Sequence, residues 1–338
     1  MRVPRAPSSQ LLQIERFVRN PELSRYFDRL EAPDFDVIAF DRAVDGNGMA
    51  TLGVHLIQKY DLLTLLNLDP QVVNRWMLVV QEGYIATNPY HNSKHAADVL
   101  FCTHFYIRSP KIWPHLGPLD LLACIIAPLI HDYGHPGVNN AFLISTLDPL
   151  SLRYNDVAPL ENYHAASVFD MMQSTELNLL ETLPLESRRY VRDLVLTMVL
   201  ATDMTAHFEW IGKFKTKLTS HTGFAYDQKT DKKLVLNMAI KATDINNAAK
   251  PNDLCVTWTN WCMEEFFLQG DQEKKRGMTV SMFMNRDNTD IPKCQIGFID
   301  YIVTPLYEAW YAYLKEDMQA MMDNIDTNRQ HWKKRVTT

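Results

Sequence analysis

An apolar run that ends in metal-binding residue types constrains the fold of this chain more than any other feature. Residues 121–130 are apolar throughout, and a helix that is apolar on every side must be buried in the middle of a protein. His131, Asp132 and His135 follow directly. We expect one helix over 118–135 that carries them at its C-terminal end, where a glycine and a proline stop it. Polar side chains at the end of a buried helix need a partner, which a metal ion would supply.

A second pair of histidines lies upstream, on another predicted helix. His91 and His95 are four positions apart, as are His131 and His135. On a helix such pairs lie on one face, about 5–6 Å apart between Cβ atoms, so both side chains can point at one ion or substrate. A single pair of this kind is more often coincidence than a ligand set. Two pairs, with an aspartate directly after one histidine, favour metal chemistry.

A fourth ligand candidate comes from a distant part of the chain. Asp244 lies near the end of a long apolar helix predicted over 232–249, where a carboxylate without a partner would be costly or forced neutral. Taken alone, Asp244 would be a polar loop residue at a helix end. Together with His95, His131 and Asp132 it makes a mixed nitrogen and oxygen set suited to zinc. An aspartate that bridges to a harder ion such as Mg²⁺ or Mn²⁺ would complete a two-metal site.

Helical periodicity dominates the remainder of the chain and strand signals are scarce. We therefore predict an all-α fold, with residues 1–338 forming one compact domain around a deep metal-containing pocket. The charged run at 271–276 is interpreted as a solvated face. The predicted helices cover residues 8–30, 49–66, 70–86, 91–105, 118–135, 139–146, 160–171, 186–201, 205–219, 232–249, 252–270, 293–304 and 305–335, and the last two are separated at Pro305.

Composition excludes several classes of protein. The formal net charge of −6 argues against a surface that coats nucleic acid, which needs a basic face. The five cysteines are odd in number and form no C-x-x-C pair, which favours buried reduced thiols in a soluble, cytoplasmic protein. The apolar run at 121–130 is about half of what a membrane span needs, and the N-terminus has no signal-peptide pattern. We expect neither a nucleic-acid partner nor direct membrane insertion.

Five motifs resemble those of a known family. They are Tyr-His-Asn-x-x-His-Ala-Ala-Asp-Val at 90–99, His-Asp-x-x-His-Pro-Gly at 131–137, Leu-Glu-Asn-x-His at 160–164, Ala-Thr-Asp-Met at 201–204 and Gln-Ile-Gly-Phe-Ile-Asp at 295–300. In this order and spacing they are similar to the catalytic domain of class I 3′,5′-cyclic nucleotide phosphodiesterases. Trp-Thr-x-x-x-Met-Glu-Glu-Phe-Phe at 258–267 and Gln-Gly-Asp at 269–271 resemble the cAMP-specific type-4 pattern. The resemblance covers about residues 50–335, and residues 1–49 are an N-terminal helical and loop region.

The resemblance implies hydrolysis of the 3′,5′-cyclic phosphodiester of cAMP to the 5′-monophosphate, with cGMP as a second candidate substrate. His95, His131, Asp132 and Asp244 would hold Zn²⁺, and Asp132 would also touch a second ion, Mg²⁺ or Mn²⁺. A hydroxide between the two ions would attack phosphorus. His91 would protonate the departing 3′ oxygen as general acid.

The resemblance also implies roles for residues around the metals. Glu161 would orient and charge the His91 imidazole. The amide of Gln295 would bind the purine edge while Phe298 stacks on the ring. Residues near the metal-bound waters would be His135, Thr202 and Asp203, and the substrate-binding residues would be Tyr90, Met204, Asn247, Cys262, Phe266, Gln295 and Phe298.

The chain departs from the type-4 pattern at three places. Gly134 stands where that pattern has an acidic residue, and Lys241 stands where it has a histidine. The segment after Asp244 is Ile-Asn-Asn-Ala, so the shape of the pocket near Asn247 differs. The choice between cAMP and cGMP therefore stays open at this stage.

Two other functions compete with hydrolysis. A cyclic-nucleotide sensor could use the same fold and metal without turnover, although it would have no need of His91 as a proton donor. A more distant His-Asp phosphohydrolase would leave the element from Gln295 to Phe298 unexplained. Oligomeric state does not follow from the sequence, and any targeting or regulatory domain would lie outside this chain.

Overall fold

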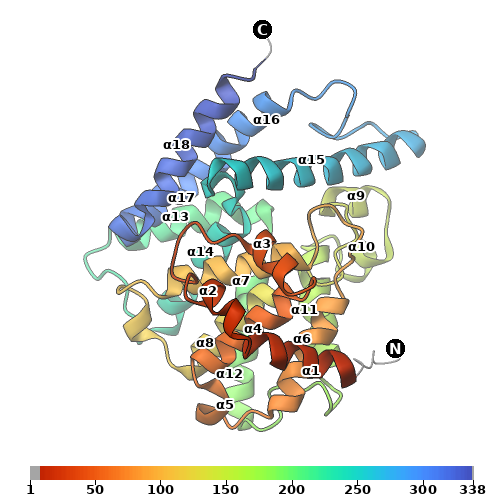
Figure 1. Cartoon of the computed structure of the whole chain (residues 1–338). Coiled ribbons are helices and arrows are strands. Elements are labelled where there is room, and N and C mark those ends of the chain that lie inside the picture. Colours follow the sequence, from red (N-terminus) through yellow and green to blue (C-terminus); the bar gives the residue numbers. More distant parts are fainter. Residues whose placement is uncertain (1–7, 337–338) are drawn as a thin grey trace.

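The computed structural model describes residues 8–336, and the regular secondary structure in that range is helical, which confirms the all-α prediction (Figure 1). The ends of the predicted domain, residues 1–7 and 337–338, lie outside the described residues. The first nine α-helices are α1 (Ser8–Val18), α2 (Ser24–Phe27), α3 (Val37–Ala43), α4 (Gly48–Lys59), α5 (Leu62–Leu65), α6 (Pro70–Glu82), α7 (Ser93–Ile107), α8 (Pro118–Ile130) and α9 (Asn140–Ser145). The next nine are α10 (Pro149–Arg153), α11 (Pro159–Met171), α12 (Leu185–Leu200), α13 (His207–Leu218), α14 (Lys229–Asp244), α15 (Asn252–Lys275), α16 (Ile291–Phe298), α17 (Thr304–Leu314) and α18 (Gln319–Lys333).

Short 3₁₀ and π turns join several of these helices. The 3₁₀ turns are η1 (Pro21–Leu23), η2 (Trp113–His115), η3 (Met204–Ala206), η4 (Asn246–Ala249) and η6 (Lys315–Met318), and η5 (Ile299–Val303) is a π turn.

The apolar helix α8 lies at the centre of the molecule, as predicted. Its residues from Asp120 to Ile130 are all buried, and it packs against α7, α12 and α4. Each leucine or isoleucine that is fully withdrawn from water there contributes about 1.5–3 kcal/mol. The main hydrophobic core runs from Ile14 in α1 to Trp332 in α18, so both ends of the described chain are tied to one core.

Helix α8 ends one turn earlier than predicted, so His131 and His135 do not share a helical face. His131 is the C-cap residue, and Gly134 adopts a left-handed conformation with φ of +70°. The His131 imidazole also bonds to the Pro128 carbonyl at 2.7 Å, and that carbonyl is one of the groups a helix end leaves without a partner. The glycine and this local bond turn the chain before the second histidine.

The other predicted histidine pair is divided in the same way. Helix α7 begins at Ser93, because the Asn92 side chain caps it by accepting the amide of Lys94 at 2.9 Å. His91 lies before this cap, outside the helix, whereas His95 lies in the first turn. A strong N-cap therefore separated the pair that the four-residue spacing had placed on one face.

Two predicted N-terminal helices are also broken. The segment 8–30 stops at Val18, because Asn20 precedes a proline and is held extended. The segment 49–66 divides at Asp61, which has a positive φ of 53°. Residues 33–48, whose proline and glycines favour a loop or short helical turns, contain the short helix α3.

The C-terminal third corrects two further predictions. Helix α15 continues through the charged run to Lys275, five residues beyond its predicted end. The run is largely solvated, as predicted, because Gln272, Lys274, Lys275 and Arg276 are exposed, but Glu273 is buried. Its carboxylate accepts the amide of Ser281 at 2.6 Å and the Ser281 hydroxyl at 2.8 Å. Pro305 does not interrupt the helical structure, because it falls in the first turn of α17, where a missing N–H costs little. The break comes at Lys315, which has a φ of +59°.

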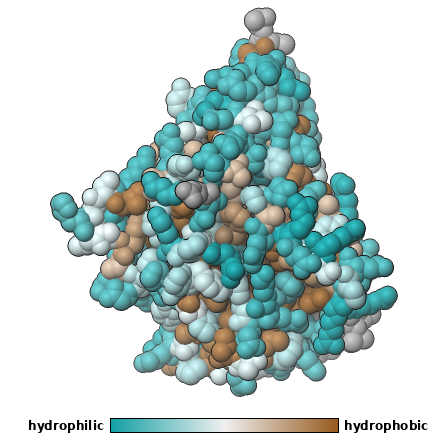
Figure 2. All heavy atoms as spheres, turned by 60° about the vertical axis from the view of Figure 1, so that its left-hand side comes forward, coloured by the Kyte–Doolittle hydropathy of each residue, from teal (hydrophilic) through white to brown (hydrophobic). Residues whose placement is uncertain are grey.

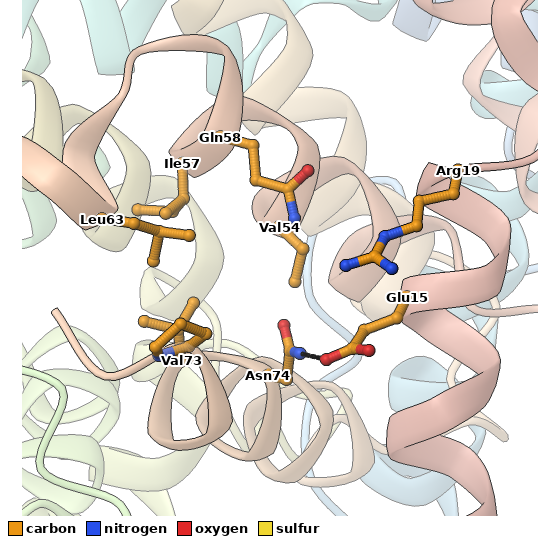
Figure 3. Close-up of a pocket in the computed structure, with 9 residues that line it drawn as sticks. Glu15, Arg19, Val54, Ile57, Gln58, Leu63, Val73 and Asn74 are labelled. Carbon is orange, nitrogen blue, oxygen red and sulfur yellow. Dashed lines mark hydrogen bonds between the residues drawn. The ribbon is translucent and has the colours of Figure 1, made fainter.

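A cavity of about 150 Å³ lies between α1, α4 and α6, apart from the candidate site residues (Figure 3). Val54, Ile57 and Val73 line its apolar side, and Asn74 donates a 2.8 Å hydrogen bond to Glu15 at its edge.

The face drawn in Figure 2 mixes hydrophilic residues with smaller hydrophobic patches. None of the helices within residues 8–336 has the length and apolar character needed to cross a membrane.

Candidate active site

Four side chains from three parts of the chain converge on one point. They are His95, His131, Asp132 and Asp244, and one ligand atom of each lies within 4.8 Å of the others. The Nε2 atoms of His95 and His131 are 3.2 Å apart, and Asp244 Oδ1 lies 3.1 and 3.3 Å from them. Asp132 Oδ2 lies 3.1 Å from His131 Nε2 and 3.4 Å from His95 Nε2.

These spacings fit a bound cation. Zinc binds nitrogen and oxygen ligands at about 2.0–2.2 Å, which makes the edges of a tetrahedron of ligands roughly 3.3–3.6 Å long. The five separations of 3.1–3.4 Å lie close to that range. A cation placed between two imidazole nitrogens and two carboxylates at such distances could bind all four. The donor set therefore suits a divalent metal ion.

The surrounding backbone orients these ligands. The Nδ1–H of His131 donates to the Pro128 carbonyl, which leaves Nε2 free to bind a metal. His95 is held in the first turn of α7, and Asp244 is the last residue of α14. Both histidines are buried, whereas Asp132 and Asp244 are half-buried. The two carboxylates are thus the part of the group that is partly open to solvent.

Electrostatics keep both aspartates ionised. Burial would raise the pKa of Asp132, but His131 and then His91 outweigh it and hold that pKa well below its usual range. Burial likewise opposes ionisation of Asp244, and its hydrogen bonds with His131 and His95 bring its pKa down. Two anionic carboxylates beside buried imidazoles attract a cation.

His91 has a carboxylate partner, but the partner is Glu265 and not Glu161. The Glu265 carboxylate bonds to His91 Nδ1 and accepts the amides of Tyr90 at 3.0 Å and of His91 at 2.9 Å. Burial alone would lower the pKa of His91, but the charges of Glu265 and then Asp132 raise it to about 9. His91 is therefore protonated at neutral pH, as a general acid must be.

The prediction that Glu161 orients His91 is corrected by these contacts. Both oxygens of Glu161 accept from the Asn140 amide, at 3.2 and 2.9 Å. Burial raises the pKa of Glu161 to about 7. Glu265 belongs to the Met-Glu-Glu-Phe-Phe motif, so the sequence contained the signal, but nothing in the motif itself says which histidine the glutamate meets.

A stack of three imidazoles borders the metal ligands. His135 stacks on His91, with ring centroids 4.0 Å apart and planes 18° from parallel, and His164 lies beyond it at 5.7 Å. His135 Nδ1 accepts the amide of Gly137 at 3.0 Å. His91, His135 and Asp132 form a second group of converging ligand atoms. Asp132 is the residue that the two groups share.

Residues 90–325, which include this entire constellation, match the family model described as 3′5′-cyclic nucleotide phosphodiesterase. The chain belongs to this family. Its motifs had resembled the class I catalytic domain, and that resemblance is confirmed.

Individual relatives agree with the family match. The chain is 33% identical over 331 residues to the human high affinity cAMP-specific and IBMX-insensitive 3′,5′-cyclic phosphodiesterase 8A, covering 93% of this chain and 40% of the relative. It is 34% identical over 322 residues to the phosphodiesterase 8 of Drosophila melanogaster, which bears the same description, covering 93% and 35%. The chain thus spans two fifths or less of the length of these curated relatives. The structure of LmjPDEB1 in complex with IBMX superposes with a TM-score of 0.89 at 26% identity, covering 98% of both chains.

The Ala-Thr-Asp-Met motif forms the turn between α12 and η3. Thr202 is buried and donates its hydroxyl to the Val199 carbonyl at 2.8 Å. Asp203 caps η3 by accepting the amide and hydroxyl of Thr205, at 2.8 and 2.6 Å. Met204 is 44% exposed. The turn therefore has a defined shape. Among the hydrogen bonds and ion pairs within residues 8–336, none joins its side chains to His95, His131, Asp132 or Asp244.

The predicted substrate-binding residues fall into separate groups. Cys262 packs against Tyr90 in one small cluster, and Phe266 packs in another. Gln295 is buried and its side-chain oxygen accepts from the Thr259 hydroxyl at 3.4 Å. Asn247 is buried within η4, and Phe298 packs at the edge of the main core.

Proposed function

We propose that this chain hydrolyses the 3′,5′-cyclic phosphodiester of a cyclic nucleotide to the 5′-monophosphate in a metal-dependent reaction. One observation carries the proposal: four ligand atoms spaced for one cation lie beside a protonated imidazole, in a chain of this family. His95, His131, Asp132 and Asp244 would hold Zn²⁺, and Asp132 would share a second ion, Mg²⁺ or Mn²⁺. Bound cations would lower the pKa of water and offset the charge that develops on the phosphate.

The proton-donating role of His91 rests on its two nitrogens. Nδ1 bonds to Glu265, so the proton available to a substrate is on Nε2. Nε2 lies 4.0 Å from Asp132 Oδ2, which directs it toward the metal-ligand group. From there it would protonate the 3′ oxygen as that oxygen leaves phosphorus. His135, stacked on the ring, keeps the imidazole from turning away.

We further propose cAMP as the substrate, with cGMP as the alternative nucleotide. The two curated relatives are described as cAMP-specific. The Gln295 amide can present a donor or an acceptor to a purine edge. Phe298, three positions further on, and Phe266, which packs against the cluster that contains Cys294, supply aromatic surface. The five cysteines are free, which supports a cytoplasmic location.

The alternative of a nucleotide sensor without turnover is disfavoured by the His91–Glu265 pair. A carboxylate that raises the pKa of an imidazole serves proton transfer, and simple binding has no use for it.

Hydrolysis of cAMP and of cGMP by the purified chain, with zinc and Mg²⁺ present, tests the proposal. We expect formation of AMP, and a loss of at least a hundredfold in the Asp244→Ala variant. A loss of only a few-fold would remove Asp244 from the metal site. Binding of cAMP with no AMP formed would favour the sensor.

A further inference from the structure

Lys241 is a buried lysine that the proposed reaction does not use. It lies on α14, and 2% of its surface is exposed. Among the ion pairs of residues 8–336, none includes Lys241, whereas the buried Lys250 pairs with Asp98 at 2.7 Å. The Lys241 ammonium instead donates to the Ala201 carbonyl at 2.8 Å and lies 3.5 Å from the Asp203 carbonyl.

Stability alone does not account for a charge in this position. Transferring an ammonium from water into a protein interior costs several kcal/mol, and replacing such a group by an apolar one of similar size is often neutral or stabilising. Burial lowers the pKa of Lys241 to about 8, while Asp244, Asp203 and Glu161 oppose that shift. The group therefore remains mainly charged at neutral pH.

The two carbonyls near the Lys241 ammonium belong to the residues on either side of Thr202. Ala201 is the C-cap of α12, and Asp203 is the N-cap of η3. They flank Thr202, so Lys241 fixes the backbone on both sides of that residue. Helix C-terminal carbonyls carry partial negative charge, which suits an ammonium better than a neutral donor.

The same helix carries a metal-ligand residue. Lys241 and Asp244 are three positions apart on α14, a spacing that places them on one face. Helix α14 thus links the Asp244 carboxylate to the turn that contains Thr202, Asp203 and Met204. A shift of that turn relative to Asp244 would be resisted by the Lys241 ammonium.

We propose that Lys241 is a positioning residue that holds the turn between α12 and η3 in register with the metal-binding end of α14. This inference rests on the proposed hydrolase function, and it deepens that function by assigning the lysine that replaces the type-4 histidine. It acts through the turn and does not touch the substrate.

The test compares Lys241→Met and Lys241→Gln with Lys233→Met in the zinc- and Mg²⁺-loaded chain. Lys233 lies on the same helix, but its ammonium donates to the Asp193 carboxylate at 2.7 Å and has no hydrogen bond to the turn that contains Thr202. Hydrogen exchange of a peptide spanning residues 199–207 reports the turn without requiring activity. Steady-state hydrolysis of cAMP reports kcat and KM.

For Lys241→Met we expect exchange of this peptide at least tenfold faster, a thermal midpoint no lower than that of Lys233→Met, and kcat reduced about tenfold with KM within twofold. Lys241→Gln keeps an N–H donor and should recover part of both losses. Unchanged exchange and kcat in Lys241→Met would overturn the proposal, as would equal losses in Lys233→Met. A wild-type chain without hydrolysis would refute the proposed function, while the exchange result would still decide the role of Lys241.

Discussion

At the scale of single residues, the His91–Glu265 pair is the feature with the clearest chemical consequence. The carboxylate raises the pKa of His91 to about 9, against the effect of burial. Replacing Glu265 by glutamine keeps a hydrogen-bonding group but removes the negative charge, so the pKa of His91 must fall.

A general acid acts in its protonated form, so this change has a definite sign. In Glu265→Gln the alkaline limb of the profile of kcat/KM against pH should move to lower pH by at least one unit, and activity should fall more at pH 8 than at pH 6.5. Glu264→Gln is the matched control, because Glu264 lies beside it on α15 but pairs with Arg286 at the surface. An alkaline limb at the same pH in both variants would show that Glu265 does not charge His91.

Some single residues of the site could be predicted from the sequence, but the contacts between distant residues could not. Asp244 could be assigned because a carboxylate at the end of a buried helix needs a partner. Glu265 could not be matched to His91, since the two are 174 positions apart and meet only when α15 packs against the loop before α7. Patterns along the chain identify residue types, whereas pairing depends on tertiary packing.

At the scale of secondary-structure elements, short-range capping determined where the helices end. The apolar pattern located α8 and α14, although each ends five residues before its predicted end. Asn92 and Gly134 placed His91 and His135 outside their predicted helices. In the last helices, a residue expected to end a helix did not do so, and the helix ended elsewhere. Pro305 looked like a break and is tolerated in a first turn, while the break at Lys315 had no signal in residue type.

The turn after α8 yields a prediction for stability. Gly134 has a φ of +70°, and a Cβ there would lie 3.0 Å from the Tyr163 hydroxyl. Gly134→Ala should therefore lower the free energy of unfolding by about 1–3 kcal/mol, measured by denaturant titration. Gly212 lies inside α13 with nothing within 4 Å of an added Cβ, so Gly212→Ala should raise the same quantity by about 0.5–1 kcal/mol. Equal stabilities of the two variants would contradict this account of the turn.

At the scale of the whole molecule, the proposed metal site joins elements from three parts of the chain. The ligands come from α7, from the turn after α8 and from α14, all of which pack on the main core. A cation bound there adds cross-links that the unfolded chain does not have. Binding at a thousand times the dissociation constant stabilises a native state by about 4 kcal/mol.

Removal of the metal should therefore reduce stability as well as activity. A chelator should lower the thermal midpoint of the wild-type chain by several degrees, and added zinc should restore it. In Asp244→Asn the chelator should have a much smaller effect, because one charged ligand is already lost. A midpoint that does not respond to chelator in the wild-type chain would indicate that the four residues bind no structural cation.

The most direct measurement of the central claim is anomalous scattering at the zinc edge from crystals of the zinc-loaded chain. The account predicts a peak about 2 Å from the ligand atoms of His95, His131, Asp132 and Asp244. With zinc in excess, a map with no peak at this point, or with its strongest peak elsewhere, would contradict it.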